Sequence, residues 1–211
     1  RKFSQLAEGA SLSRTALRDF VAVAMQATSL LERNLLQAND LIGHFKQVAV
    51  DQTSAQRRRF DLAATIGEIV ATLQPQYRKT PHRLRIDIPD GIVMDSFPGP
   101  LGQVITNLAT NALVHGFAQA EAGLLEIEVS QPRNGRLTMT VSDNGCGIAA
   151  EHLPRIFDPF FTTRLGQGGS GLGLHIVYSI ATRVLGGRIE ARSTPGTGTT
   201  FVLELPLQAP D

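Results

Sequence analysis

The apolar residues of this chain follow a helical spacing first and a strand spacing later. From Ser11 to about Val50 the sequence contains no proline and a single glycine, Gly43. Apolar residues recur there at steps of three and four: Leu31, Leu35, Ala38, Leu41, Ile42, Phe45 and Val48. This spacing predicts a long amphipathic helix, with Ser13 as its candidate N-cap.

The apolar stripe of such a helix needs a partner. Either the helix packs on its own domain, or it belongs to a helical hairpin that dimerises as a bundle. The stretch that follows, VDQTSAQRRR (Val50–Arg59), is polar and ends in three arginines, as a solvated linker does. We therefore favour the hairpin, and predict a helical region over residues 1–56 and a separate domain over residues 57–211.

The second region alternates helical and strand patterns. FDLAATIGEIVATLQPQY predicts a short strand, a cap at Asp61 and a helix that ends near Gln74. HRLRIDIP, GLLEIEVSQ and RLTMTVSD predict strands, the last two joined at Asn134-Gly135, a strong hairpin signal. Helices are predicted for PGPLGQVITNLATNALVHGF and for residues 172–185. A closing hairpin is predicted for GGRIEARS and TTFVLELPL. The expected fold class is α+β, a two-layer α/β sandwich preceded by a long helical segment.

Composition narrows the function classes. The 211 residues are 42% hydrophobic and 18% charged, and the net charge of +1 gives no hint of a nucleic-acid surface. One cysteine excludes a disulfide framework within the chain and fits a reducing compartment. No apolar run approaches 18 residues, so we expect no membrane contact. We interpret the chain, which starts at Arg1, as a cytoplasmic fragment of a longer protein that could itself be membrane-anchored.

Two polar clusters are candidates for chemistry. Asn107 and Asn111 are one turn apart on a predicted helix and share its face. Amide oxygens are hard ligands that suit Mg²⁺. The second cluster, Asp143-Asn144-Gly145-Cys146-Gly147, directly follows a predicted strand. Taken alone, it fits an ordinary Asx turn better than a binding loop.

Two further clusters follow along the chain. Phe157–Thr163 holds three phenylalanines, which fit a core plug or a binding loop. GQGGSGLGLHIV (Gly166–Val177) contains G-x-G-x-x-G and opens a helix, whose free N–H groups favour phosphate. It does not follow a buried strand, as a dinucleotide-binding turn must, and the chain has no G-K-[ST] of a phosphate loop.

Together, the four clusters resemble the N, G1, F and G2 boxes of sensor histidine kinases, in order and spacing, over about Phe60 to Leu207. GTGTTF (Gly196–Phe201) is similar to the motif that closes the same domain, and DLIGHFKQVA resembles the second dimerisation helix. The resemblance implies the Bergerat ATP-binding fold shared with DNA gyrase and MutL. It implies ATP and Mg²⁺ as cofactors, a homodimer through the hairpin, and a response-regulator receiver domain as partner.

The resemblance also assigns roles to single positions. Asp143 matches the carboxylate that accepts the adenine amino group, and Gly145 and Gly147 let the backbone pass close to the base. Asn111 matches the Mg²⁺ ligand, and Asn107 lines the phosphate side.

Other positions depart from the family pattern or match it less closely. His115 falls where an aromatic ring often covers adenine, although a structural helix histidine fits almost as well. Val114 stands where lysine is frequent, so Arg164 either supplies a phosphate contact or remains solvated. Thr199 is expected to hold an adenine-side water, and Cys146 needs no chemical role. The remaining expected ATP-binding residues are Ile148, Phe157, Phe160, Thr162, Thr163, Gly169, Ser170, Gly171, Leu172, Gly173 and Leu174.

The phosphoacceptor motif of the family is missing. None of the five histidines precedes an acidic residue, and His44, although on the hairpin helix, has the wrong context. We infer an acceptor upstream of Arg1, while a degenerate dimerisation domain remains the alternative. The predicted function is transfer of the ATP γ-phosphoryl group to that histidine, for relay to a response-regulator aspartate. The alternatives are an ATPase, disfavoured because Asn107 cannot act as a base, and an ATP-sensing module without transfer.

Overall fold

The computed structural model describes residues 14, 15, 17–31, 56–118, 120–163 and 170–210. Residues 14, 15 and 17–31 are helical, as the sequence predicts for this part of the chain. The candidate cap Ser13 and the apolar stripe beyond Leu31 lie outside the described residues. Within the part that the structure describes, no helix is long and apolar enough to cross a membrane.

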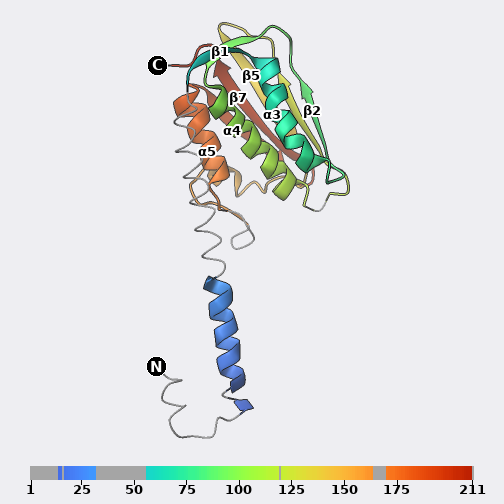
Figure 1. Ribbon diagram of the computed structural model, residues 1–211, viewed down its shortest axis with the longest axis vertical. Helices are drawn as coiled ribbons and strands as arrows, with labels where there is room; N and C mark the ends of the chain where they lie inside the picture. Colours follow the sequence, from blue (N-terminus) through green and yellow to red (C-terminus); the bar gives the residue numbers. More distant parts are fainter. Residues whose placement is uncertain (1–13, 16, 32–55, 119, 164–169, 211) are drawn as a thin grey trace.

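A five-stranded sheet forms one layer of the following domain (Figure 1). Its order is β2-β4-β5-β7-β6, with β2 (Arg83–Asp87) parallel to β4 (Leu124–Val129) and the other pairs antiparallel. The other strands are β5 (Arg136–Asp143), β6 (Arg188–Thr194) and β7 (Gly198–Pro206). The mainly antiparallel sheet and its helical layer confirm the predicted α+β sandwich.

A small second sheet changes the interpretation of the linker. β1 (Arg58–Asp61) pairs with β3 (Val93–Ser96), a strand that the sequence analysis does not predict. Two of the three linker arginines therefore belong to a strand. The third, Arg57, donates from Nε to Asp95 Oδ1 at 3.0 Å. Arg58 and Arg59 are nevertheless exposed, as the sequence predicts for a solvated run, whereas the ion pair leaves Arg57 half-buried.

Three helices, α3 (Leu62–Tyr77), α4 (Pro98–Asn111) and α5 (Gly173–Ser179), cover one face of the sheet (Figure 1). The Asp61 carboxylate accepts from the Ala64 N–H at 2.8 Å, which confirms the predicted cap. The expected end near Gln74 is wrong, since α3 continues past Pro75 to Tyr77. Proline cannot donate a backbone hydrogen bond inside the helix. Burial of Leu73 and Tyr77 compensates for this loss in the last turn.

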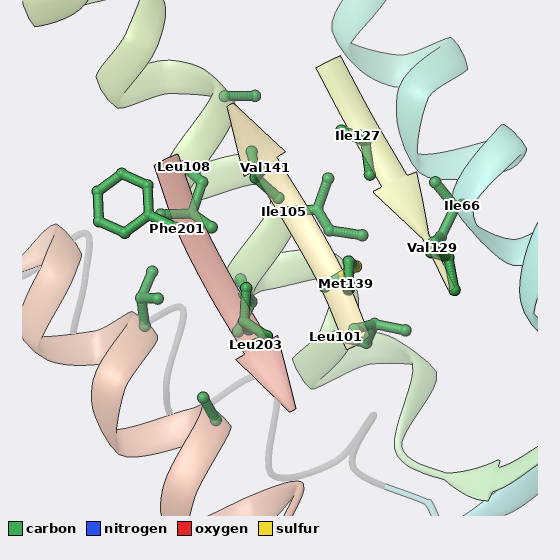
Figure 2. Packing of buried hydrophobic residues seen from close by; sticks show 14 of the residues in the cluster. Ile66, Leu101, Ile105, Leu108, Ile127, Val129, Met139, Val141, Phe201 and Leu203 are labelled. Carbon is green, nitrogen blue, oxygen red and sulfur yellow. The ribbon is translucent and has the colours of Figure 1, made fainter. Parts of the chain in front are cut away.

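The core fills the space between the sheet and these helices (Figure 2). Alternate residues of each central strand are buried, as the two-residue period predicts. The sheet side includes Ile127, Val129, Met139, Val141, Phe201 and Leu203, and the helix side Ile66, Leu101, Ile105 and Leu108.

A tight turn joins β4 and β5. Asn134 and Gly135 have φ values of 52° and 73°, and the flanking Arg133 and Arg136 exchange backbone hydrogen bonds of 2.7 and 3.0 Å. Positive φ at both central residues is the signature of a type I′ hairpin turn. The structure therefore confirms the hairpin that Asn134-Gly135 predicts.

Candidate functional site

A cavity of about 430 Å³ opens between α4, the ends of β5 and β7, and the start of α5. Three other segments contribute to its wall: the π-helical turn Ala112–Gly116 that extends α4, the loop after β5, and residues 161–163. The predicted site residues that line it are Asn107, Asn111, His115, Asp143, Gly147, Ile148, Thr162, Thr163, Ser170, Gly171, Gly173, Leu174 and Thr199.

Some predicted site residues do not line this cavity. Phe157 packs against Tyr178, with ring centroids 5.4 Å apart, and Phe160 is 57% exposed on a loop. Gly145 lies beneath the π turn, and Leu172 immediately precedes α5. Arg164 and Gly169 lie outside the described residues.

Other lining residues were not predicted as ligands. They are Thr110, Ala112, Val114, Gly116, Cys146, Ala149, His152, Ile156, Phe161 and Phe201. Thr110 and Val114 follow Asn107 and Asn111 at helical spacing, so the face shared by the asparagines could have found them. His152 faces Phe161 at 5.6 Å between centroids; Phe161 belongs to the phenylalanine cluster of residues 157–163, whereas no sequence signal marks His152.

Asp143 places a partly desolvated carboxylate at the wall of the cavity. Burial raises its pKa above the ordinary value of 3.8, while the backbone N–H groups of Gly145 and Thr199 act in the opposite direction. The Gly145 N–H donates to Oδ1 at 2.9 Å. A carboxylate has acceptor capacity beyond these two bonds, so Asp143 can also accept from an amino group of a ligand.

Glycines allow the loop after β5 to pass very close to its neighbours. A Cβ on Gly145 would lie 2.4 Å from the Gly116 carbonyl oxygen. A Cβ on Gly147, which has a φ of +70°, would lie 2.3 Å from the Thr194 carbonyl oxygen. Cys146 between them donates its N–H to Gly116 O at 2.9 Å and accepts from Gly196 N at 2.8 Å. The loop is thus fixed to the π turn on one side and to the β6–β7 turn on the other.

A hydroxyl pair supports the same loop from β6 and β7. Ser193 Oγ accepts from the Ile148 N–H at 2.8 Å and lies 3.0 Å from Thr199 Oγ1. Thr199 lines the cavity, although only 5% of it is exposed. This arrangement holds Ile148 at the cavity wall, and Thr199 itself lies opposite Asp143 in the pairing of β5 with β7.

Two amide side chains of α4 also line the cavity. Asn107 and Asn111 are half-buried on α4. Asn111 Oδ1 would lie 3.7 Å from a Cβ added to Gly173, so the amide faces the beginning of α5. The described residues contain no cluster of three or more His, Cys, Asp or Glu side chains able to hold a metal. A cation here would therefore depend on amide oxygens and on oxygens that a ligand brings.

Comparisons with known proteins agree on one family. Residues 98–209 match the family described as histidine kinase-, DNA gyrase B-, and HSP90-like ATPase. Sensor histidine kinase ZraS of Klebsiella oxytoca is 40% identical over 110 residues, which are 52% of this chain and 22% of that protein. ZraS of Salmonella typhimurium is 32% identical over 171 residues, 81% of this chain and 30% of that protein. The chain thus spans less than a third of the length of these relatives.

Solved structures show the same similarity. The catalytic domain of histidine kinase ThkA aligns with a TM-score of 0.64 at 26% identity, covering 72% of this chain and 97% of that domain. Full-length ShkA in complex with AMPPNP aligns with a TM-score of 0.63 at 25% identity, covering 97% of this chain and 41% of ShkA.

Proposed function

The chain belongs to the family of histidine kinase-, DNA gyrase B- and HSP90-like ATPases, and from this premise we propose that its cavity binds ATP. The protein is then the catalytic portion of a sensor histidine kinase, which transfers the γ-phosphoryl group to a histidine. Similarity to the ZraS kinases and to ShkA in its AMPPNP complex supports the proposal.

The observation that carries the proposal is the desolvated carboxylate of Asp143. In a cavity bounded by glycine backbone, this carboxylate selects a flat ligand with an exocyclic N–H donor, as adenine is. A hydrogen bond to a charged acceptor contributes about 1.5–3 kcal/mol. Gly145 and Gly147 let the loop that follows Asp143 pack directly on the backbone of Gly116 and Thr194.

The phosphates are assigned to the end of the cavity with Asn107 and Asn111. Mg²⁺ usually takes one or two protein oxygens together with substrate phosphates and water. The Asn111 amide oxygen fits that donor set, since the described residues offer no larger cluster. Bound there, Mg²⁺ would neutralise phosphate charge, while the chain itself orients the phosphates and limits water access.

The asparagine at position 107 favours transfer of the γ-phosphoryl group to a histidine over hydrolysis of ATP by water. Water attack needs a base near the terminal phosphate, and an amide cannot serve as one at neutral pH. Among the described residues that line the cavity, Asp143 is the only carboxylate, and its Oδ1 is bonded to the Gly145 N–H. We therefore assign Asn107 to phosphate binding and not to catalysis of hydrolysis.

The acceptor is proposed to be a histidine of an upstream dimerisation helix, and the onward acceptor an aspartate of a response-regulator receiver domain. Helical residues 17–31 expose Leu17, Phe20, Val21 and Leu31 on one side of the helix, and Val23, Met25 and Leu30 on its other sides. A second copy of the chain is the proposed cover for these side chains. Because ATP is the phosphoryl donor, we place this region in the cytoplasm.

Calorimetric titration with MgATP tests the proposal. Asp143→Ala removes the carboxylate and should weaken binding roughly 10- to 100-fold, the affinity equivalent of one charge-assisted hydrogen bond. Asp90→Ala is the matched control, because Asp90 is exposed and does not line the cavity. Equal affinity of Asp143→Ala and the parent chain would remove Asp143 from the site.

A further inference from the structure

Tyr77 is a buried polar side chain that the proposed chemistry does not use. It is the last residue of α3, in the turn beyond Pro75, and only 4% of it is exposed. Its hydroxyl donates to the backbone carbonyl of Ala109 on α4, with an O···O distance of 2.9 Å. A side chain of one helix thus bonds the main chain of the helix that carries both site asparagines.

The carbonyl that Tyr77 holds lies where α4 changes pitch. α4 ends at Asn111 and continues directly into the π turn Ala112–Gly116. The Ala112 N–H points to the carbonyls of Ala109 and Leu108, whereas Phe117 N–H donates to Ala112 O, five residues back, at 2.8 Å. Such π segments recur at functional sites, since they rotate the side chains that follow.

The π turn sets the shape of the cavity beside Asp143. It carries His115, which lines the cavity, and Gly116, whose added Cβ would lie 3.1 Å from Asp143 Oδ1. Its far end is fixed, because Gly116 O accepts from the Cys146 N–H at 2.9 Å. Near its other end, the Tyr77 hydroxyl of α3 donates a hydrogen bond to Ala109 O of α4.

We propose that the Tyr77 hydroxyl is a positioning group of the nucleotide site, which fixes the junction between α4 and the π turn through Ala109. The junction in turn sets Asn111 and His115 relative to Asp143. The inference rests on the proposed function for the identity of the ligand, whereas its geometric part concerns the chain alone.

The hydroxyl keeps its proton, so it is available as the donor to Ala109 O. Burial, and to a lesser extent the charge of Asp143, raises the pKa of Tyr77 well above its ordinary value. The phenol therefore stays protonated at neutral pH.

Tyr77→Phe is the direct test, because it removes the hydroxyl and keeps the ring that packs in the core. Ile66→Val is the matched control: it trims a fully buried side chain of the same helix without touching a polar contact. MgATP affinity and backbone hydrogen exchange are measured for both variants and the parent chain, at a temperature where all three are folded. We expect Tyr77→Phe to bind about 3- to 10-fold more weakly and to exchange faster at residues 112–117, and Ile66→Val to match the parent in both.

Unchanged exchange at residues 112–117 in Tyr77→Phe would overturn the inference. So would faster exchange there with unaltered affinity, because the hydroxyl would then stabilise the junction without positioning the site. Weaker binding by Ile66→Val to the same degree would assign the effect to general loss of stability. If the parent chain itself fails to bind MgATP, the proposed function fails, and the exchange comparison alone decides whether Tyr77 holds the junction.

Discussion

At the scale of single residues, the buried carboxylate of Asp143 has two opposite effects: it is proposed to strengthen ligand binding, and it lowers the stability of the folded chain. Its pKa is raised by burial, so the folded chain binds more protons than the unfolded chain between the ordinary pKa of 3.8 and the raised value. The free energy of unfolding therefore falls as pH rises through that window, and the ionised carboxylate lowers stability above it.

Asp143→Asn should consequently raise the melting temperature of the ligand-free chain at pH 7. The amide can still accept from Gly145, but it carries no charge to desolvate. Melting curves across the acidic range check this: the advantage of the variant should shrink as pH falls and Asp143 becomes protonated. A stability gain independent of pH would contradict burial of the charge as its cause.

The residues of the cavity that the sequence predicts share a visible pattern. Asn107 and Asn111 have helical spacing, and Asp143 with its glycines directly follows a strand. His152 has no such pattern, because the path of an irregular loop brings it to the cavity, and the phenylalanine cluster of residues 157–163 does not indicate that Phe161 is the member that lines it. Tyr77 lies outside any motif, and only the packing of α3 against α4 reveals its bond to Ala109.

At the scale of elements, the β4–β5 turn offers a perturbation remote from the cavity. Gly135 has a φ of +73°, where a side chain is strained although a Cβ would meet no neighbour within 4 Å. Gly135→Ala should therefore lower the free energy of unfolding by about 1–2 kcal/mol, the cost of the left-handed conformation. MgATP affinity should stay unchanged.

Chemical denaturation with Asn134→Gly as the companion variant checks this expectation, since glycine tolerates the φ of 52° at that position. Equal stability of Gly135→Ala and the parent chain would mean that the turn adopts another conformation in solution.

The elements that the sequence predicts well have long, regular patterns. Buried residues alternate with less buried ones along most of β5 and β7, and the Asn-Gly pair defines the turn between β4 and β5. β3 has only four residues, too few for its alternation to stand out. The sequence predicts too early an end for α3 because proline usually stops a helix, whereas here tertiary packing of Tyr77 outweighs that local preference.

At the scale of the whole molecule, the lack of an acceptor motif and of a base at position 107 gives a combined expectation. The purified chain should bind MgATP yet hydrolyse it slowly, since general-base assistance is typically worth ~10²–10⁴-fold in rate. It should also take up no label from γ-labelled ATP. A separately supplied upstream helix with its histidine should become labelled in its presence.

Product release in solution and acid-labile label on protein are the two measurements. Rapid steady hydrolysis would favour the ATPase alternative. Stable acid-labile label on His44 would show that the acceptor lies within this chain.

The parallel pairing of β2 with β4 governs how the domain can assemble. His82 Nδ1 accepts from the Gly123 N–H at 2.8 Å across a separation of 41 residues, at the start of this pairing. The intervening chain contains β3 and the whole of α4. Closing such a loop is slower than forming a local hairpin. During synthesis, α4 therefore leaves the ribosome before β4 and β5, which cover it in the folded domain. Its apolar face stays exposed to solvent until these strands have been made.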